Sequence, residues 1–499
     1  MKALLLYPEF PDTFWSFKHA LKFIGKRASL PPLGLLTVAA MLPAKWEKRL
    51  VDVNVRPLRE KDLAWADVVL ISAMIAQRDS ATQLIARCRA AGKTIVAGGP
   101  LFTVEQARFP DVDHLVLNEA ETTLPGFLDD FARGVARHVY TSTELPDLRE
   151  TPAPLWELVE LRRYASMSVQ YSRGCPFDCD FCSVTAMFGH RPRVKTPAQI
   201  LTELDGLWQR GWRGTVFFVD DNFIGNKRSL REELLPALVR WHRGKRGFGF
   251  YTEASINLAD DEELMRSMVA AAFDQVFVGI ETPEEASLTE CNKRQNQSRD
   301  LVADVKRIQR AGLEVQGGFI VGFDNDSPTI FQRQIDFIQK SGIVTAMVGL
   351  LQAVPGTKLH ERLHQQGRLL GETTGDNVDG TTNFIPRMNR EKLRDGYRQL
   401  MDHLYAPGPY YRRIRTFLRE YQPMRISGAA NSGNFRAFAR ASLRLGVIGR
   451  ERFHFWGLLM WTCFRRPTLV PIAVRLSIYG FHFRKCCAAL GAVTDAAAS

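Results

Sequence analysis

The chain has 499 residues, of which 45% are hydrophobic and 24% are charged, with 66 Lys and Arg against 54 Asp and Glu. This composition excludes disordered, collagen-like and disulfide-framework proteins, and the length predicts about three domains with buried cores. A mean hydropathy of −0.16 and the absence of about 18 consecutive apolar residues exclude a polytopic membrane protein.

Residues 1–145 alternate short apolar runs with stretches of helical spacing, which predicts a doubly wound, Rossmann-like parallel sheet with helices on both faces. The expected strands are 2–7, 49–53, 68–73, 93–97 and 114–117, and the expected helices are 33–42 and 80–91. The first apolar run ends at Pro8, too early for the core of a signal peptide, so we expect a cytoplasmic protein. No G-x-G-x-x-G follows that run, which argues against NAD binding.

Residues 160–370 resume the alternation with a longer period, after a linker marked by three prolines. The expected strands are 166–172, 215–220, 247–253, 275–280, 314–321 and 346–352, and the expected helices include 197–210, 260–271 and 299–311. Six such units predict a partial or full (β/α) barrel of the TIM type, whose chemistry sits at the carboxyl ends of the strands. Five polar residues fall at those ends: Asp220, Asp221, Glu253, Glu281 and Gln352. Burying a charge is costly, so we expect at least two of the carboxylates to line a site.

Three of the eight cysteines, Cys175, Cys179 and Cys182, lie within eight residues of one another, directly after the first expected barrel strand. In a cytoplasmic chain such a cluster indicates metal or redox chemistry rather than disulfides. The C-x3-C-x2-C spacing places three thiolates around one loop, which suits an iron–sulfur cluster with one open iron. A structural zinc site is the alternative, but it takes four ligands, and no fourth Cys or His lies at zinc-finger spacing.

This cysteine motif, with an aromatic residue before its third cysteine and a (β/α) barrel around it, resembles the radical S-adenosylmethionine (SAM) superfamily. The resemblance implies a [4Fe–4S] cluster held by Cys175, Cys179 and Cys182, with SAM chelated at the open iron and cleaved to a 5′-deoxyadenosyl radical.

The resemblance also assigns SAM-binding residues elsewhere in the barrel. It implies that Asp220 and Asp221 hold the methionine amine of SAM and that Glu281 reaches its ribose or methionine end. Gly318 and Gly322 would let the backbone approach the adenine, since glycine removes the steric bulk of a side chain. The alternative for these glycines is an ordinary barrel turn.

The N-terminal domain resembles that of the cobalamin-binding branch of the superfamily, on the segments 31–35, 71–74, 98–100 and 118–121. The resemblance implies a cobalamin domain over residues 1–145, with Met74, Gln77, Gly98 and Gly99 among its binding residues. The D-x-H-x-x-G motif that supplies a histidine ligand to cobalt in many cobalamin proteins is absent. The lower ligand is therefore Met74, Gln77 or nothing, and a domain that has lost cobalamin is the alternative.

Nearly the whole chain resembles the cobalamin-type radical SAM proteins that include the hopanoid C-2 methylases. The resemblance implies a C-methyltransferase that acts on an unactivated carbon of a hydrophobic substrate such as a polycyclic lipid, with an external electron donor of the flavodoxin or ferredoxin type. Two other functions stay open: a cobalamin-binding radical SAM enzyme that catalyses cyclisation, rearrangement or oxidation without methyl transfer, and a noncatalytic cobalamin- or lipid-binding protein.

Residues 371–499 form a basic, aromatic region that we expect to be α-helical. From residue 404 onwards it carries fourteen Arg and one Lys against three acidic residues, so the whole net charge of +12 lies there. Its apolar blocks are too short to span a bilayer, and arginines flank them, which favours peripheral contact with the inner face of the membrane. A helical cap with solvated arginines is the second interpretation, and nucleic-acid binding is the least favoured because the aromatic residues are mixed with aliphatic ones.

Overall fold

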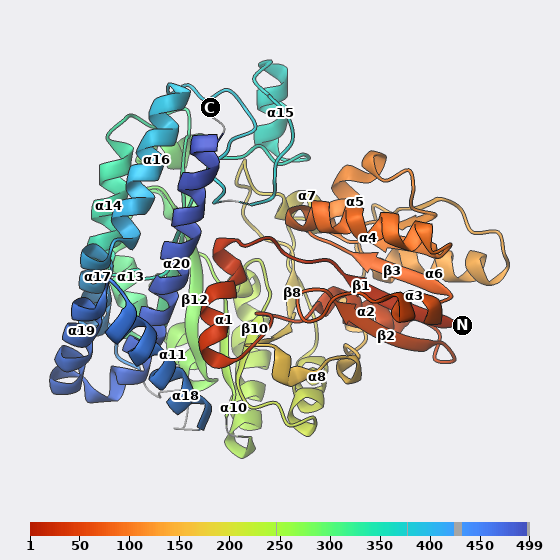
Figure 1. Ribbon diagram of the computed structural model, residues 1–499, viewed down its shortest axis with the longest axis horizontal. Helices are drawn as coiled ribbons and strands as arrows, with labels where there is room; N and C mark the ends of the chain where they lie inside the picture. Colours follow the sequence, from red (N-terminus) through yellow and green to blue (C-terminus); the bar gives the residue numbers. More distant parts are fainter. Residues whose placement is uncertain (246, 377, 424–431, 497–499) are drawn as a thin grey trace.

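The computed structural model describes residues 1–245, 247–376, 378–423 and 432–496, and its N-terminal part is a six-stranded parallel sheet (Figure 1). The strands are β1 (Lys2–Tyr7), β2 (Glu47–Asp52), β3 (Val68–Ser72), β4 (Thr94–Gly98), β5 (His114–Val116) and β6 (Val139–Tyr140), in the order β2-β1-β3-β4-β5-β6. The helices are α2 (Leu33–Met41), α3 (Glu60–Trp65), α4 (Arg78–Ala90), α5 (Pro100–Glu105) and α6 (Ala120–Ala132). The predicted doubly wound sheet is confirmed, and its order reverses between β1 and β3, where such sheets bind ligands.

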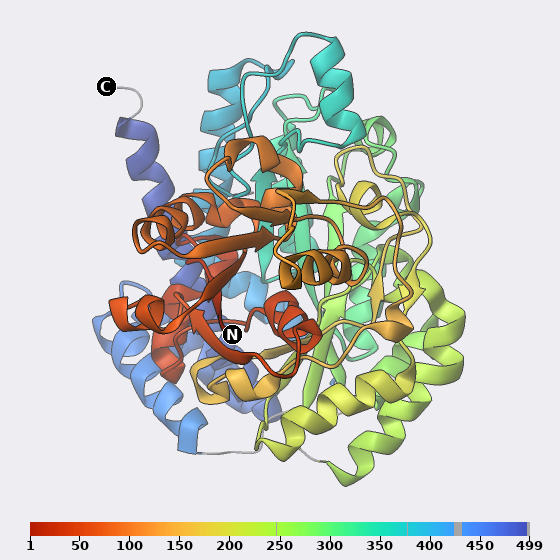
Figure 2. The same ribbon diagram turned by 90° about the vertical axis from the view of Figure 1, so that its right-hand side faces the viewer.

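A second parallel sheet follows in the order β7-β10-β11-β12-β13-β14, so the strands keep their sequence order and β7 and β14 form open edges. These strands are β7 (Met167–Val169), β10 (Thr215–Phe218), β11 (Gly249–Glu253), β12 (Phe273–Glu281), β13 (Glu314–Val321) and β14 (Ala346–Leu350). The intervening helices are α7 (Val184–Phe188), α8 (Pro197–Gln209), α9 (Lys227–Ser229), α10 (Leu235–Gly244), α11 (Glu262–Ala270), α12 (Glu285–Glu290), α13 (Leu301–Arg310) and α14 (Ile330–Ser341). The predicted partial barrel is confirmed, and turning the molecule by 90° places the N-terminal sheet in front of it (Figure 2).

The first expected barrel strand, 166–172, is divided in two. Its carboxyl end becomes β8 (Ser172–Arg173), which pairs antiparallel with β9 (Arg193–Val194) in a separate two-stranded sheet. The apolar run ends because the chain leaves the barrel at this point to form the cysteine loop. The sequence pattern did not predict this hairpin, since two-residue strands carry no periodicity.

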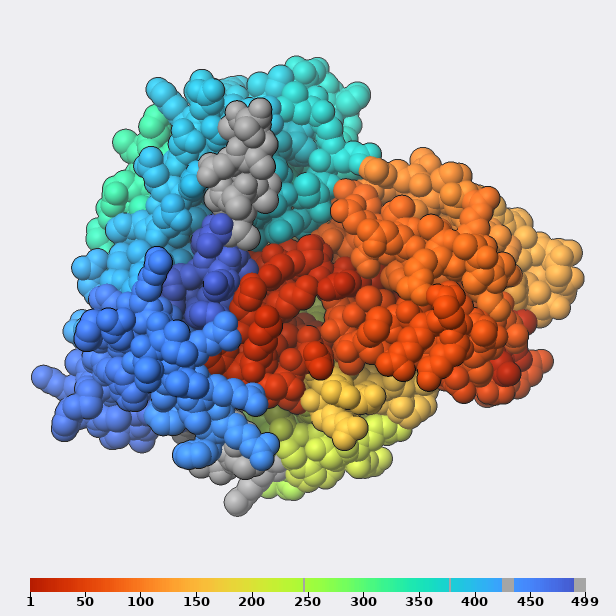
Figure 3. Space-filling model, viewed as in Figure 1, coloured from red at the N-terminus to blue at the C-terminus, as the bar shows by residue number. Residues whose placement is uncertain are grey.

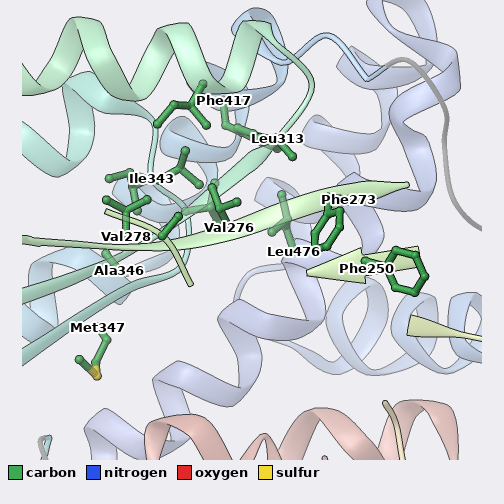
Figure 4. Packing of buried hydrophobic residues seen from close by; sticks show 14 of the residues in the cluster. Phe250, Phe273, Val276, Val278, Leu313, Ile343, Ala346, Met347, Phe417 and Leu476 are labelled. Atoms are coloured by element: carbon green, nitrogen blue, oxygen red, sulfur yellow. The ribbon is translucent and has the colours of Figure 1, made fainter. Parts of the chain in front are cut away.

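The C-terminal helices cover the outside of the barrel. They are α15 (Lys358–Gln365), α16 (Arg390–Tyr405), α17 (Pro407–Glu420), α18 (Ser432–Ala441), α19 (Arg452–Arg465) and α20 (Val470–Ala496). Phe417 of α17 and Leu476 of α20 lie in one continuous core with strand residues such as Val276 (Figure 4). Within the described ranges, no helix combines the length and apolarity needed to cross a bilayer.

One arginine of this region is buried, and another pairs with a buried carboxylate. Arg413 is fully buried and donates to the carbonyl oxygens of Leu404 and Val344 at 3.1 and 3.2 Å. Arg475 pairs with the buried Glu314 of β13. A helical cap therefore exists, but part of its positive charge stabilises its own packing, contrary to the expectation of solvated arginines.

One N-terminal segment leaves its own sheet. Between β1 and α2 the chain forms a short 3-10 turn, η1 (Phe14–Ser16), and helix α1 (Lys18–Ile24), which lies beside α20 (Figure 1). The Phe14 ring stacks on that of Phe483 with centroids 4.1 Å apart, and Trp15 Nε1 donates to Met347 Sδ of β14 at 2.9 Å. In the space-filling view this red segment lies between the blue C-terminal helices and the orange N-terminal lobe (Figure 3).

The packing of α20 can be tested at Gly480, where a Cβ would overlap the ring of Tyr410. We expect Gly480→Ala to lower the free energy of unfolding by about 1–3 kcal/mol through overpacking, measured by thermal or urea unfolding. The matched control is Gly126→Ala in α6, where a Cβ meets open space and the better helix former adds about 0.5–1 kcal/mol. Equal effects of the two substitutions would contradict the close contact between α17 and α20.

Candidate functional site

The three clustered cysteines lie in the loop between β8 and α7. Cys179 is buried, Cys175 and Cys182 are partly exposed, and all three are free thiols. Each thiol lies close enough to influence the pKa of another, and burial raises the pKa of Cys182 to about 12. The structure thus brings together the three thiols that the sequence analysis singled out as metal ligands.

Neighbouring segments hold this loop in place. Gly174 has φ +96°, and a Cβ there would press against the carbonyl oxygens of residues 188, 189 and 191, so this position requires glycine. The backbone of Asp180 donates to the Cys291 carbonyl at 3.0 Å and accepts from Leu359 N at 2.8 Å. The loop is therefore fixed from two directions before any ligand binds.

A buried lysine faces the cysteines. Lys293 Nζ donates to Glu281 Oε1 at 2.6 Å and lies 5.8 Å from the Phe181 ring. Burial alone would lower the pKa of Lys293, but Glu281 and the nearby Cys179 raise it above its usual range. The Lys293 ammonium group lowers the pKa of all three thiols and so opposes the effect of their burial, which raises it. Sequence reasoning missed Lys293, because nothing in its local pattern marks it as a partner of the cysteines.

The paired aspartates after β10 have different surroundings. Both oxygens of Asp220 are used within the protein: they accept from Ser172 N, from Ser172 Oγ at 2.5 Å and from Tyr171 N at 3.1 Å. Asp221 accepts from the backbone N–H of Gly174, and its Oδ2 is buried without a hydrogen-bond partner among the described residues. This geometry favours a positioning role for Asp220 and leaves Asp221 available to a ligand.

A third carboxyl, Glu253, ends the neighbouring strand β11. Burial raises the pKa of Glu253 to about 8, of Asp220 to about 7 and of Asp221 to about 6. Like-charge repulsion from Asp221 adds to the shift of Asp220, and repulsion from both aspartates adds to that of Glu253. Carboxyl groups whose pKa is raised and that do not form an ion pair with a neighbouring cation are typical of sites that bind a cationic ligand or transfer protons.

The barrel glycines have contacts within the protein. A Cβ at Gly318 would lie 2.7 Å from the Phe277 ring, so this glycine is needed for packing between β12 and β13. Gly322 has φ +105°, and its N–H donates to Asp326 Oδ2 at 2.8 Å. Both positions therefore have a structural reason to be glycine, and their predicted place near an adenine stays a prediction.

On the N-terminal sheet, the predicted residues lie in the loops that follow β3 and β4. The Met74 side chain is 49% exposed. Gln77 is buried, with its Oε1 accepting from Met74 N at 2.9 Å and its Nε2 donating to Pro8 O at 2.6 Å. Both ends of the Gln77 amide are thus used to shape the loop, which leaves Met74 as the side chain available to a ligand.

Gly98 and Gly99 form the other predicted part of this edge. A Cβ at Gly98 would lie 2.6 Å from Val116 O, and Gly99 has φ +91° at the start of α5. Both positions therefore have a structural reason to be glycine, and their predicted contact with a cofactor stays a prediction.

Buried ion pairs join the N-terminal sheet to the cysteine loop. Arg173 of β8 pairs with Glu119 at 2.5 Å and with Glu121 at 2.9 Å, and Arg193 of β9 pairs with Glu119 at 2.7 Å. These four side chains are between 4% and 18% exposed. The two acidic residues begin α6 at the carboxyl edge of one sheet, and the arginines flank the cysteines of the other. The bridge therefore brings the two predicted binding edges together.

A loop after the barrel closes one side of this junction. Arg78 of α4 donates to the carbonyl oxygen of Thr373 at 2.9 Å, and Thr373 donates through Oγ1 to Gln352, just after β14. Gln352, expected from the sequence at a strand end, thus positions this loop.

Three family patterns cover most of the chain. The B12 binding domain matches residues 27–128, the radical SAM superfamily matches residues 169–338, and a domain of unknown function (DUF4070) matches residues 357–493.

Curated relatives match along nearly the full length. An uncharacterized methyltransferase of Synechocystis sp. is 42% identical over 97% of this chain and 91% of the relative. The hopanoid C-2 methylase of Rhodopseudomonas palustris is 33% identical over 91% of this chain and 88% of the relative.

Solved structures share the fold. The cobalamin-dependent SAM radical enzyme OxsB, with aqua-cobalamin and SAM bound, has a TM-score of 0.63 and 13% identity, covering 99% of this chain and 80% of its own. The radical SAM methyltransferase TsrM from Kitasatospora setae, with cobalamin and a [4Fe–4S] cluster bound, has a TM-score of 0.57 and 15% identity, covering 79% and 85%.

The raised carboxyl pKa values make the stability of the cofactor-free protein depend on pH. An acid whose pKa is raised in the folded state contributes stability that is complete below its unfolded pKa and is lost as the pH rises through its folded pKa. We therefore expect the free energy of unfolding to fall between about pH 4 and pH 8, the range bounded by the ordinary and raised values. Glu253→Gln removes one of these protons and makes the slope shallower by up to about 1.4 kcal/mol per pH unit.

Urea unfolding at pH 6, 7 and 8 measures this slope. Glu47→Gln, which changes an exposed glutamate of β2, is the matched control and leaves the slope unchanged. Parallel slopes for the wild type and Glu253→Gln would contradict the raised pKa of Glu253.

Proposed function

Since the chain belongs to the cobalamin-binding radical SAM methyltransferases, we propose that it methylates an unactivated carbon of a hydrophobic, polycyclic lipid. The enzyme uses a [4Fe–4S] cluster, SAM and cobalamin. The observation that carries the substrate class is the 33% identity to a hopanoid C-2 methylase over 91% of this chain, which includes the C-terminal region. An external electron donor of the flavodoxin or ferredoxin type supplies the reducing electron.

The cysteine loop fits the cluster by its donor set. Cys175, Cys179 and Cys182 hold it as thiolates, and Lys293 offsets part of their negative charge. Gln295 Nε2 lies 3.7 Å from Cys179 Sγ and Asn222 Nδ2 lies 3.9 Å from Cys175 Sγ, so both amides donate weakly to sulfur. When bound, the cluster and SAM supply a radical that removes hydrogen from an unactivated carbon, and cobalamin supplies the methyl group.

The remaining barrel residues orient SAM. The orphaned Oδ2 of Asp221 is an acceptor for its ammonium group, and Glu253 adds a second carboxyl beside it. Asp220 holds the strand that leads into the cysteine loop, and Glu281 keeps the Lys293 cation in place. On the other edge, the loop with Gly98 and Gly99 would hold the corrin ring, and the exposed Met74 side chain would be available to it.

The ion pairs that join the two sheets fix the position of one predicted binding edge relative to the other. Arg173 and Arg193 lie on the strands that flank the cysteines, and their partners lie at the edge that binds cobalamin. The loop held by Arg78 joins the end of the barrel to the N-terminal sheet at this junction, where it would help to exclude water. Water exclusion protects reactive intermediates from side reactions.

The C-terminal region carries a membrane-docking face. Nine large apolar side chains are exposed within α18, the π-helical turn η11 (Ser442–Ile448) and α19: Phe435, Phe438, Leu443, Val447, Ile448, Phe453, Trp456, Met460 and Phe464. Phe435, Phe453 and Phe464 are 73%, 77% and 79% exposed. A monomeric protein rarely gathers so many exposed apolar groups on one short segment without a partner.

The charges of the proposed docking face favour an anionic lipid surface as its partner. Between residues 432 and 466 the sole acidic residue is Glu451, which is buried and pairs with Arg484 at 2.6 Å. Exposed arginines alternate with the apolar groups, and each cation near an anionic leaflet adds about 1 kcal/mol. Docking on the inner face of the membrane gives access to a lipid substrate that is nearly insoluble in water.

The methyltransferase function is tested with anaerobically reconstituted protein, methyl-labelled SAM and a reductant. We expect 5′-deoxyadenosine and S-adenosylhomocysteine together, with label in a hopanoid-type polycyclic lipid and none in a linear fatty-acid lipid. Cys182→Ser removes a cluster ligand and lowers both products by at least about 100-fold, more than the loss of an outer-shell partner costs. Cys463→Ser, at an exposed thiol of α19, is the matched control and keeps activity.

Two outcomes contradict the proposal in different ways. 5′-Deoxyadenosine without S-adenosylhomocysteine would show a radical reaction that moves no methyl group. Methyl transfer to the linear lipid but not to the polycyclic one would overturn the substrate class alone.

Docking is measured by flotation with vesicles of phosphatidylglycerol and phosphatidylcholine against phosphatidylcholine alone. We expect preferential binding to the anionic vesicles that weakens as salt increases. The double substitution Phe453→Ser and Phe464→Ser lowers binding on the order of tenfold or more, because it removes two apolar side chains from the lipid contact.

Leu370→Ser with Ile385→Ser changes two half-exposed apolar residues outside the docking face and is the matched control. Equal binding by both double variants would contradict a specific docking face.

A further inference from the structure

A cluster of metal-binding side chains lies far from the cysteine loop in sequence, where the N-terminal segment meets α20. We propose that Asp12, His19, His482 and Cys486 bind one zinc-type divalent cation that joins the N-terminal segment to α20. This site is independent of the proposed methyl transfer, since none of its residues lies on a barrel strand or on the loops that carry the three clustered cysteines.

The first three residues converge from separate elements. One ligand atom from each of Asp12, His19 and His482 lies within 4.8 Å of the other two. Asp12 Oδ2 is 2.8 Å from His19 Nε2, and the two imidazole rings have centroids 5.5 Å apart. Asp12 precedes η1, His19 lies in the first turn of α1 and His482 lies on α20, and Figure 1 shows α1 beside α20.

The hydrogen bonding of His482 prepares it as a ligand. Its ring is fully buried, and Nε2 lies 2.9 Å from the carbonyl oxygen of Phe14. A carbonyl can only accept, so Nε2 carries the hydrogen and Nδ1 keeps its lone pair. Metal-binding histidines usually donate their second N–H to a carbonyl or carboxylate in this way, which fixes the ring and its tautomer.

Cys486 supplies the fourth group. It follows His482 by four residues, so both side chains lie on one face of α20. Cys486 Sγ lies 3.7 Å from His482 Nδ1 and 3.6 Å from its Nε2, just outside the group formed by the other three residues. Zinc–sulfur and zinc–nitrogen bonds of about 2.3 and 2.05 Å at a tetrahedral angle separate the two ligand atoms by roughly 3.6 Å. The distance from Sγ to Nδ1 is therefore in the range of two ligands of one zinc ion, and Cys486 completes the set by turning its side chain from the imidazole toward the other three ligands.

The chemistry of the four ligands and the exposure of two of them to solvent indicate which class of metal would bind. Two imidazoles, a thiolate and a carboxylate are a mixed nitrogen, sulfur and oxygen set that suits a tetrahedral zinc ion better than magnesium or calcium. The side chains of Asp12 and His19 are 41% and 23% exposed, which gives the ion a path to the buried His482. Binding requires the Cys486 thiol to release its proton.

The test uses the holoenzyme with its cluster and cobalamin in place. The protein is exposed to zinc sulfate, desalted, and analysed for zinc, iron and cobalt by mass spectrometry. We expect about one zinc per chain, held by a complete set of four ligands. His482→Gln and His19→Gln each lower the zinc content at least about tenfold, while iron and cobalt stay unchanged. Cys487→Ser, at the neighbouring thiol of α20, is the matched control and keeps the zinc.

X-ray absorption at the zinc edge separates this site from zinc bound at the cluster cysteines. The proposed site gives one sulfur ligand at about 2.3 Å and three nitrogen or oxygen ligands, whereas the cluster loop would give three sulfurs. His19 is partly exposed, so His19→Gln reports on the metal even if the buried His482 variant fails to fold. Less than about a tenth of a zinc per chain in the wild type, or full zinc in His19→Gln, would overturn the proposal, since a four-ligand site depends on each ligand.

Discussion

The architecture depends on the buried ion pairs between Arg173, Arg193, Glu119 and Glu121. Each of the two sheets offers a carboxyl edge to a ligand, and an enzyme that uses cobalamin together with a radical needs those edges in one place. The desolvation penalty of burying four charges is offset only because each charge has a partner at hydrogen-bonding distance. Removing one partner from such a set typically lowers the free energy of unfolding by about 3–5 kcal/mol. No one of these four residues can therefore be replaced alone without a large loss of stability.

The barrel beside that junction also contains buried charges that offset one another. Lys293 places one buried cation beside three thiols, and Glu281 holds it there. On the other side, Asp220, Asp221 and Glu253 are three neighbouring acids whose burial raises their pKa values toward neutral pH. An incoming cationic ligand would favour their ionised form again, so ligand binding and proton release are coupled at this site.

The sequence predicted those parts of the molecule whose pattern is local. The strands Lys2–Tyr7 and Glu314–Val321 were predicted to the residue, because strands buried on both faces read as continuous apolar runs. The three cysteines could be found because their spacing alone carries the chemistry. Lys293 could not, since its role depends on a fold that brings it to a distant loop. The sequence left Met74, Gln77 and no residue as alternatives for the lower ligand of cobalt, and the structure adds that both ends of the Gln77 amide are used inside its own loop.

The segment between β1 and α2 has a consequence for synthesis of the protein. Phe14 is stacked on Phe483 and its carbonyl oxygen accepts from His482, 468 residues later in the chain. At about 5–20 residues per second, a ribosome needs roughly half a minute to a minute and a half to reach that partner. Throughout this interval the apolar side chains of the segment lack their final contact, although the sheet on either side of them can already form. The segment around Phe14 therefore completes its packing only after α20 has been synthesised.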